Sequence, residues 1–331
     1  MLKQGPFFIN LNLRISILTL TVLIACGCMP KADTSAPEVL IDRPKVSFTF
    51  DDGITTDILH YPFEDWNEMI LASLRKEELT AAFFVTGRNK QDAKGRFLLD
   101  TWSKEGHLIA NHTFTHPSFH SEERTVEDFE EELLKTDKVI SSYDTYTKLF
   151  RFPYLKEGKT KEQIEGYRAV LEQHDYRNGH VTIDASDWYV NSQLISYMRQ
   201  EEADTTEIDK YSSFYLQHIL ERANFYDSLA YAFTDRHIPH TLLLHHNLSS
   251  ALFLGDLIAK FKEEGWEVVD ADEAFQDPFF SKVPGTHPAG ESLVWSLAKE
   301  TGEYEAILRY PAEDSQYEIP KMEKFGLQIR D

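Results

Sequence analysis

Cysteine is almost absent from this sequence of 331 residues. Its two cysteines, Cys26 and Cys28, stand close together near the N-terminus, so the rest of the chain has no thiol for a disulfide bond. Basic residues are also scarce, since 34 Lys and Arg stand against 55 Asp and Glu, and the formal net charge is −21. An acidic surface of this kind repels nucleic acid and anionic lipid headgroups, which argues against both as ligands.

The apolar run over residues 15–25 is too short to span a bilayer comfortably. It follows the positive charges of Lys3 and Arg14, an arrangement typical of a signal peptide. The run ends in LIAC at residues 23–26, which resembles the bacterial lipobox. We therefore predict a lipoprotein-type signal peptide over residues 1–25, lipidation of Cys26, and a location in the cell envelope outside the cytoplasm. Cys28 is the alternative lipidation site, and a plain signal peptide or a buried N-terminal helix is the alternative structure.

Residues 26–43 are rich in polar residues and proline, which predicts a linker. From residue 44 onward strand-like and helix-like segments alternate, and a single helical stretch is expected over residues 190–238. Strands joined by helical crossovers predict a closed or nearly closed (β/α) barrel, with a flat doubly wound sheet as the alternative. Residues 281–331 are expected to form a C-terminal extension. The seven expected strands are residues 46–50, 81–85, 107–111, 149–152, 180–184, 241–245 and 266–269.

Polar residues follow the ends of these expected strands, where the loops of a parallel barrel converge on one face. They are Asp51, Asp52, His112, His116, Arg151, Asp184, Asp187 and His245. His112 and His116 stand four residues apart, and Asp52 can complete a set of two histidines and one carboxylate that suits zinc or a similar ion. Its neighbour Asp51 is then free to act as a base. Taken singly, an Asp-Asp-Gly turn and hydrogen-bonded core histidines explain the same residues.

The whole set is more specific, because five short motifs occur in the order found in one family. They are TFDDG at 49–53, HTFTH at 112–116, RFPY at 151–154, DASDW at 184–188 and LLH at 243–245. Over residues 44–280 the chain resembles the polysaccharide deacetylases, carbohydrate esterase family four, with a NodB-type domain. The resemblance implies an α/β fold, a distorted (β/α) barrel with about seven parallel strands.

The resemblance also implies residue roles on the metal side of the site. Asp52, His112 and His116 resemble ligands of one divalent metal, Zn²⁺ or alternatively Co²⁺. Asp51 resembles a catalytic base, with Arg151 as its charged partner. Tyr154 resembles the residue whose backbone N–H stabilises the oxyanion of the tetrahedral intermediate.

On the opposite side, His245 resembles the general acid, and Asp187 the carboxylate that orients it. Trp188 and Leu243 are expected to wall the pocket for the acetyl methyl group. Two features depart from the common pattern. His246 stands where many members carry Asp, which opens the question of which histidine faces the cleft, although His245 fits the motif register. The helical stretch at 190–238 is longer than is usual.

The implied function is a metal-dependent hydrolase that removes acetyl groups from N-acetylated sugar polymers or oligomers, acting on linear amides rather than peptide bonds. The expected partner is an acetylated glycan substrate. We expect no binding to nucleic acid, and contact with the membrane only through the lipid anchor. An O-acetyl esterase of the acetylxylan type is one alternative, because ester and amide hydrolysis use the same oxyanion chemistry. A catalytically inactive glycan-binding lipoprotein is the other. The complete set of base, ligands and acid favours an enzyme.

Overall fold

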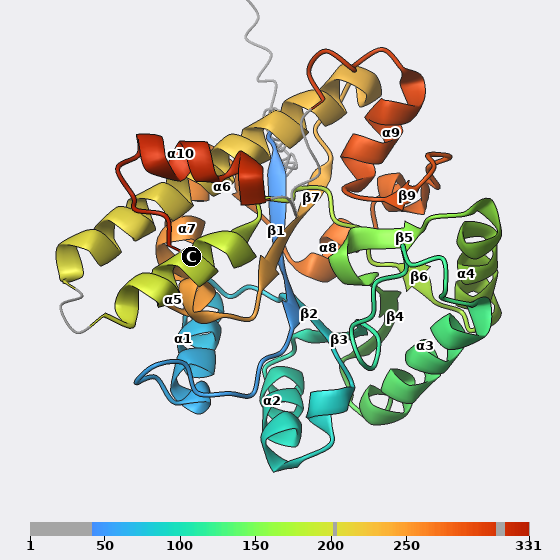
Figure 1. Ribbon diagram of the computed structural model, residues 1–331, viewed down its shortest axis with the longest axis horizontal. Coiled ribbons are helices and arrows are strands. Elements are labelled where there is room, and N and C mark those ends of the chain that lie inside the picture. The colour runs from blue at the N-terminus through green and yellow to red at the C-terminus, as the bar shows by residue number, and fades with distance from the viewer. Residues whose placement is uncertain (1–41, 201–203, 309–314, 331) are drawn as a thin grey trace, which may run out of the picture. The chain divides into compact units, whose positions relative to one another are not determined.

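Seven parallel strands form the central sheet of the protein (Figure 1), in the order β6-β4-β3-β2-β1-β7 with β8 also paired to β1. The structure is a computed structural model, and it describes residues 42–330 apart from 201–203 and 309–314. The strands are β1 (Lys45–Asp52), β2 (Ala82–Val85), β3 (Leu108–Asn111), β4 (Tyr146–Phe150), β6 (Arg177–Asn178), β7 (Pro239–His245) and β8 (Glu267–Val268).

Strand β1 shows how the sequence builds this sheet. Its alternate residues Val46, Phe48 and Phe50 are buried and belong to the main hydrophobic core. The residues between them are polar and face the other side of the strand. Among these, the Thr49 hydroxyl donates to the Leu242 carbonyl at 2.9 Å and also accepts from a buried arginine. The inner face of β1 is therefore polar, and its side chains can form hydrogen bonds with charged groups inside the barrel.

The segment that follows β6 closes the sheet into a distorted barrel. β6 itself pairs with β4, and in the segment after it Ile183 forms a parallel bridge with Leu242 of β7. The predicted (β/α) barrel is confirmed, and the flat sheet considered as an alternative is not observed. The predicted strand at 180–184 is wrong, because this bridge is its only strand pairing in the structure as described. The N–H groups of Thr182 and Ile183 both donate to the Thr241 carbonyl, at 3.1 Å each, which breaks the regular ladder.

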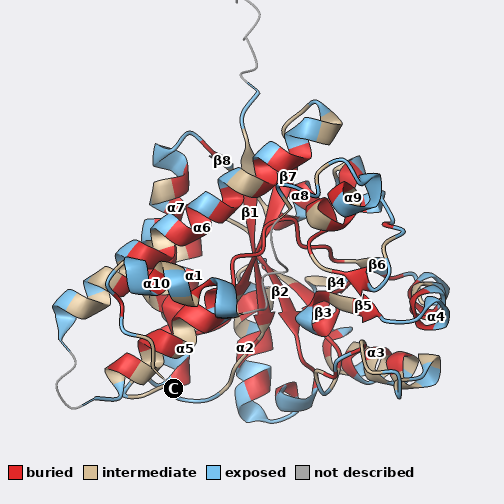
Figure 2. Cartoon of the chain, turned by 45° about the horizontal axis from the view of Figure 1, so that its top comes forward, coloured by how far each residue is buried: buried red, intermediate tan, exposed pale blue. Residues whose placement is uncertain are grey.

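Helices surround the sheet, and their inner faces are buried while their outer faces are exposed (Figure 2). Two helices begin with capping boxes, in which the hydroxyls of Thr125 and Thr160 accept from the backbone N–H groups three residues on. The helices between strands are α1 (Phe63–Lys76), α2 (Ala93–Lys104), α3 (Val126–Ile140), α4 (Lys161–Gln173) and α7 (Leu248–Glu263), and α8 (Ala271–Phe275) follows β8.

The stretch expected to be one helix over 190–238 is two helices, α5 (Asp187–Met198) and α6 (Thr205–Thr234). Asp204 caps α6 by accepting from the Glu207 N–H at 2.9 Å, so the second helix has its own start signal. At 30 residues, α6 is about 45 Å long. It packs against α5, α7 and α9 (Leu293–Thr301).

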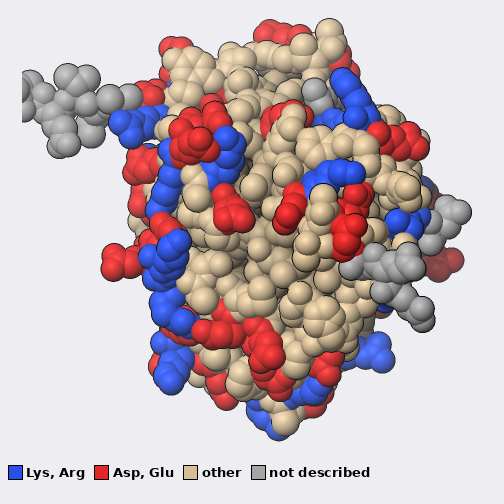
Figure 3. All heavy atoms as spheres, turned by 90° about the vertical axis from the view of Figure 1, so that its left-hand side faces the viewer, with Lys and Arg blue, Asp and Glu red and all other residues tan. Residues whose placement is uncertain are grey.

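The C-terminal part of the chain packs on the barrel. β9 (Ala289–Gly290) pairs antiparallel with β5 (Lys156–Gly158), and the Leu293 N–H donates to the Val181 carbonyl at 2.8 Å. The last helix, α10 (Ile319–Lys324), lies near α5 and α6 (Figure 1). On the side of the molecule seen in Figure 3, acidic and basic side chains are intermingled around uncharged areas.

The N-terminal region stays a prediction. The expected signal peptide, the lipidated Cys26 and most of the expected linker lie outside the described residues. Within the part of the chain that is described, no helix has both the length and the apolar character needed to cross a membrane.

Candidate active site

A cavity of about 350 Å³ opens at the carboxyl ends of the strands, a size common for small-ligand sites. Of the residues predicted from the sequence, two form a buried layer behind it, Arg151 and Asp187. The cavity is lined by Asp51, Asp52, His112, His116, Tyr154, Leu155, Asp184, Trp188, Leu243 and His245. Residues from five separate motifs thus meet in one cleft.

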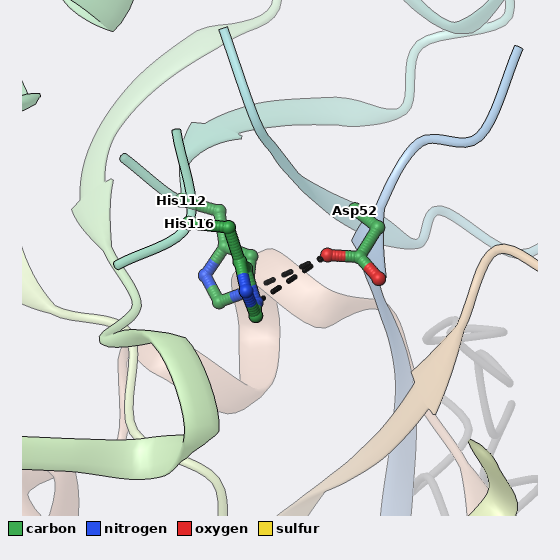
Figure 4. A group of neighbouring side chains, drawn as sticks. All are labelled: Asp52, His112 and His116. Carbon is green, nitrogen blue, oxygen red and sulfur yellow. Dashed lines mark ion pairs between the residues drawn. The ribbon is translucent and has the colours of Figure 1, made fainter. Parts of the chain in front are cut away.

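The candidate metal triad consists of Asp52, His112 and His116, whose ligand atoms lie within 4.8 Å of one another (Figure 4). The Nε2 atoms of His112 and His116 stand 3.9 and 3.6 Å from the Asp52 Oδ1 atom. Two ligand atoms bound tetrahedrally to one zinc ion stand roughly 3.4 Å apart, given the usual zinc–ligand distances. The donor set and its spacing fit a divalent ion with positions left open.

Both histidines of the triad are held in the form that binds metals. Burial lowers the pKa of His112 to about 4, and burial together with the neighbouring His112 lowers the pKa of His116 to about 4. The Nδ1 atom of His112 lies 2.8 Å from the Arg151 carbonyl, which can only accept. Nδ1 therefore carries the proton and Nε2 presents its lone pair toward Asp52, which is how ligating histidines are commonly oriented.

Strained backbone conformations are concentrated around the cavity. Six non-glycine residues around the cavity have a positive φ, a conformation that L-residues rarely adopt and that clusters at functional sites. They are Asp52 (77°), Thr113 (68°), His116 (60°), Tyr154 (56°), Leu155 (56°) and Ser186 (49°). At Asp52 the turn lets two neighbouring carboxylates reach the same cavity, because a continued strand would send them to opposite faces.

Asp51 is buried against Arg151, whose Nη1 atom donates to the Asp51 Oδ1 atom at 2.7 Å. The same guanidinium donates through Nε to the Gly179 carbonyl and lies 3.8 Å from the centre of the Phe84 ring. Burial raises the pKa of Asp51 above its usual value, although the Arg151 charge opposes the rise. The second oxygen, Oδ2, faces the site and lies 3.6 Å from the His112 Nε2 atom.

Asp187 holds His245 by two contacts. The Asp187 Oδ1 atom lies 2.6 Å from the His245 Nδ1 atom, and Oδ2 accepts from the His245 backbone N–H at 2.9 Å. Burial lowers the pKa of His245, but the Asp187 charge and hydrogen bond, with Asp52 and Asp51, outweigh it and raise the pKa to about 10. A divalent cation at the triad would oppose part of this rise. The imidazole is thus fixed in orientation with its Nε2 side toward the cavity.

His246 lies on the opposite side of β7, fully buried. Its Nε2 atom lies 3.0 Å from the Asn67 Oδ1 atom, which also accepts from the Trp102 indole N–H. The ring packs 4.3 Å from the Trp66 ring, and burial lowers its pKa well below the usual value. His245 therefore faces the cavity, whereas His246 packs in the hydrophobic core.

Apolar side chains form the walls and floor of the cavity. Leu243 packs with Leu155 and Val181 in a small separate hydrophobic cluster. Tyr154 and Trp188 are exposed for 49% and 36% of their surface and flank the mouth. The cavity thus places an apolar recess beside the polar triad, with two exposed aromatic rings at its edge.

Sequence reasoning missed Lys90, which is fully buried behind the site. Its Nζ atom donates to the carbonyls of Gly53 and Asp52 at 2.5 and 3.0 Å. Burial lowers the pKa of Lys90 to about 7. Nζ also donates to the Asn89 Oδ1 atom at 2.9 Å. No pattern around Lys90 marks it, because its other partners are backbone carbonyls that only the folded turn brings together.

These features define a class of protein: an α/β barrel with a cluster of side chains that could hold one divalent metal. Residues 41–178 match the family model described as polysaccharide deacetylase. The resemblance found in the motifs is confirmed over that region, where the chain is similar to the polysaccharide deacetylases.

Curated relatives carry names from the same family. The chain is 25% identical over 148 residues to a peptidoglycan-N-acetylglucosamine deacetylase of Bacillus cereus, covering 44% of this chain and 47% of that protein. It is 34% identical over 101 residues to a chitooligosaccharide deacetylase of Rhizobium leguminosarum bv. trifolii, covering 30% and 41%. The chain spans about half the length of the curated relatives it matches.

Among solved structures, a mutant of a CE4 family pseudoenzyme from Bacillus anthracis, described as having restored enzymatic activity, superposes with a TM-score of 0.50. The identity is 20%, and the match covers 71% of this chain and 68% of that one. This similarity supports the fold. It does not bear on activity, which is inferred below from the residues of the site.

Proposed function

We propose that this protein is a metal-dependent deacetylase that hydrolyses acetyl groups on N-acetylated sugar polymers or oligomers. The observation that carries the proposal is the arrangement around one cavity of a metal-competent triad, a buried carboxylate and an ion-paired histidine. The names of the relatives, which include a chitooligosaccharide deacetylase, support an acetylated amino sugar as the substrate.

Asp52, His112 and His116 would hold the ion, with zinc favoured and cobalt as the alternative. A divalent ion held there polarises a carbonyl and lowers the pKa of a water molecule to about 7. The His112 hydrogen bond to the Arg151 carbonyl keeps Nε2 unprotonated for this role. The open side of the triad faces the cavity, where the acetyl group has room to enter.

Asp51 would act as the base through its Oδ2 atom, which faces the site while Oδ1 is occupied by Arg151. Burial makes this carboxylate a better proton acceptor than an exposed one, and the guanidinium fixes its direction. The Tyr154 backbone N–H would stabilise the oxyanion that forms when water attacks.

His245 would donate a proton to the departing amine. Asp187 supports this by keeping Nδ1 protonated and by favouring the imidazolium form. The methyl group of the acetyl would lie against Leu243 and Trp188, which line the same cavity. The lipid anchor at Cys26 would hold the enzyme in the cell envelope, outside the cytoplasm, within reach of a glycan.

The test is acetate release by the full-length, zinc-loaded chain from a panel of soluble substrates, namely N-acetylglucosamine oligomers, peptidoglycan fragments and acetylated xylan. We expect release from the N-acetylated substrates, loss of release after chelation, and recovery when zinc or cobalt is returned. Release from xylan alone would identify an O-acetyl esterase. Tight glycan binding with no acetate from any substrate would contradict the proposal in favour of a binding protein.

A further inference from the structure

Helix α6 lies directly behind the turn that carries Asp187. On its buried face, the His218 Nε2 atom lies 2.8 Å from the Ala185 carbonyl, and the side chain is 2% exposed. Because a carbonyl can only accept, Nε2 carries the proton and donates to it. The Phe214 ring stacks on the imidazole at an interplanar angle of 5° and a centroid distance of 5.4 Å, which fixes the direction of this donor.

A second donor of α6 reaches the neighbouring peptide, one helical turn further on. The Arg222 Nε atom donates to the Asp184 carbonyl at 3.4 Å, and this arginine is fully buried. Its guanidinium lies 4.9 and 4.8 Å from the ring centres of Phe225 and Tyr226 on the same helix. Two successive carbonyls of the turn thus accept from one helix.

The turn itself is strained and carries the groups that face the cavity. Ser186 has φ 49° and ψ 40°, and it directly precedes Asp187, the first residue of α5. Asp187 fixes His245 by two contacts, and the next residue, Trp188, flanks the mouth of the cavity. A residue in a left-handed conformation persists only where its surroundings over-determine it.

The C-terminal extension contacts α6 at the same imidazole. The Glu318 Oε2 atom lies 3.2 Å from the same His218 Nε2 atom, and both side chains are almost wholly buried. Glu318 immediately precedes α10, which lies beside α6 in Figure 1. Two segments of the chain, α6 and the residues before α10, therefore converge on the imidazole that holds the Ala185 carbonyl.

We propose that His218 and Arg222 are positioning residues, which hold the Asp184–Asp187 turn so that Asp187 keeps the His245 imidazole aimed at the substrate. This rests on the proposed function, since it assigns α6 a role in the same reaction. The geometry points to this role because a helix that served packing alone would meet the turn with apolar side chains. Here, instead, two buried polar groups are directed at its carbonyls.

The test uses the full-length, zinc-loaded chain and three variants. His218→Ala removes the donor to the Ala185 carbonyl, whereas His218→Gln keeps an N–H donor at similar reach. Leu229→Ala is the matched control, because it opens a cavity in the buried face of the same helix about 16 Å further along its axis. Arg222→Met is the second test of the same turn if His218→Ala does not fold.

Two readouts are needed. The first is kcat and KM on an N-acetylglucosamine oligomer, where we expect His218→Ala to lower kcat roughly 10- to 100-fold, as small misplacements of catalytic groups do. KM should change little, and His218→Gln should recover most of the loss. The second is the downfield proton NMR resonance of the His245 Nδ1–H, which should shift or broaden in His218→Ala and stay in place in Leu229→Ala.

The NMR readout needs no substrate, so it tests the positioning role even if the chain releases no acetate. A His218→Ala protein that is destabilised as much as Leu229→Ala, yet keeps the resonance and kcat, would overturn the proposal. Equal losses of kcat in His218→Ala and Leu229→Ala would overturn it too, because they would trace the effect to general loosening of α6.

Discussion

The two sides of the cleft are built differently. The metal side, formed by Asp51, Asp52, His112 and His116, lies at the ends of β1 and β3, which flank β2 in the sheet. It is held by short-range bonds such as that between the His116 N–H and the Thr113 hydroxyl, at 3.0 Å. The acid side, formed by Asp187, Trp188, Leu243 and His245, joins β7 to a turn braced from behind by α6.

The family match follows the same division, since it covers residues 41–178 and therefore the metal side alone. A metal site needs a few ligands at fixed spacing, which the segments at the ends of β1 and β3 could provide. The proposed acid, His245, has Asp187 as its orienting partner, and the turn of Asp187 contacts α6, a helix of 30 residues between two motifs. The comparison teaches that both sides have a long-range support, but that they differ in its origin. Arg151, which supports Asp51 and His112, lies inside the family match, whereas α6, which supports the turn of Asp187, lies outside it.

The largest effect is expected from removing a ligand on the metal side. His112→Ala should lower metal affinity by more than about 100-fold, the upper effect of losing even an outer-shell partner. Acetate release should fall with the metal content, because the triad loses one of its three ligands. Metal analysis of the dialysed protein checks this, with His107→Ala as a control that removes another buried histidine. A His112→Ala protein with a full complement of metal would argue against the triad.

A smaller effect is expected on the acid side. His245→Ala should keep its metal and lose roughly two to four orders of magnitude in turnover on an N-acetylated sugar, the usual value of general acid catalysis. The loss should be smaller on an acetate ester with a good leaving group, which needs less protonation than an amine. Comparing the two substrates on one preparation checks this. An equal loss on both would mean that His245 does not act as the acid.

His246→Ala should change stability rather than turnover. Removing a fully buried imidazole that bonds Asn67 and packs on Trp66 should lower the free energy of unfolding by about 3 kcal/mol. Urea unfolding measures this, and kcat of the folded fraction should stay near that of the unmodified chain. A well-folded His246→Ala protein with no turnover would reverse the roles of the two histidines.

Cys26→Ala should leave both sides of the cleft unchanged, because residue 26 precedes the described fold. We expect unaltered turnover on a soluble oligosaccharide and loss of partitioning into detergent. Fractionation of the expressing cells, followed by phase separation, checks the prediction. A mature chain that begins elsewhere and is never lipidated would show that the N-terminal segment is a plain signal peptide.

Much of the barrel could be predicted from the sequence because alternation in β1 and the capping boxes at Thr125 and Thr160 are local signals. The strand expected at 180–184 failed for a non-local reason, since two of its N–H groups share the Thr241 carbonyl. A helix break before Asp204 was missed within a stretch that is helical on both sides.

The residues of the site could be predicted where they follow the end of a strand or have the His-x3-His spacing. The left-handed backbone at Asp52, which brings two adjacent carboxylates into one cavity, has no signal in residue type. Lys90 and His218 were invisible for a related reason, because each acts on a backbone carbonyl. These carbonyl contacts depend on the folded path of the chain. Side chains also meet the two groups, Asn89 at Lys90 and Glu318 at His218.

The proposed mechanism depends most on two neighbouring carboxylates with different roles, Asp51 as the base and Asp52 as a metal ligand. The most direct test measures metal content and turnover of the Asp51→Asn and Asp52→Asn variants. Asp51→Asn should keep the metal and lose roughly two to four orders of magnitude in turnover, because the triad stays intact while the base is removed. Asp52→Asn should bind metal more weakly and recover part of its activity at high metal concentration. Loss of metal from Asp51→Asn, with retention by Asp52→Asn, would contradict the account.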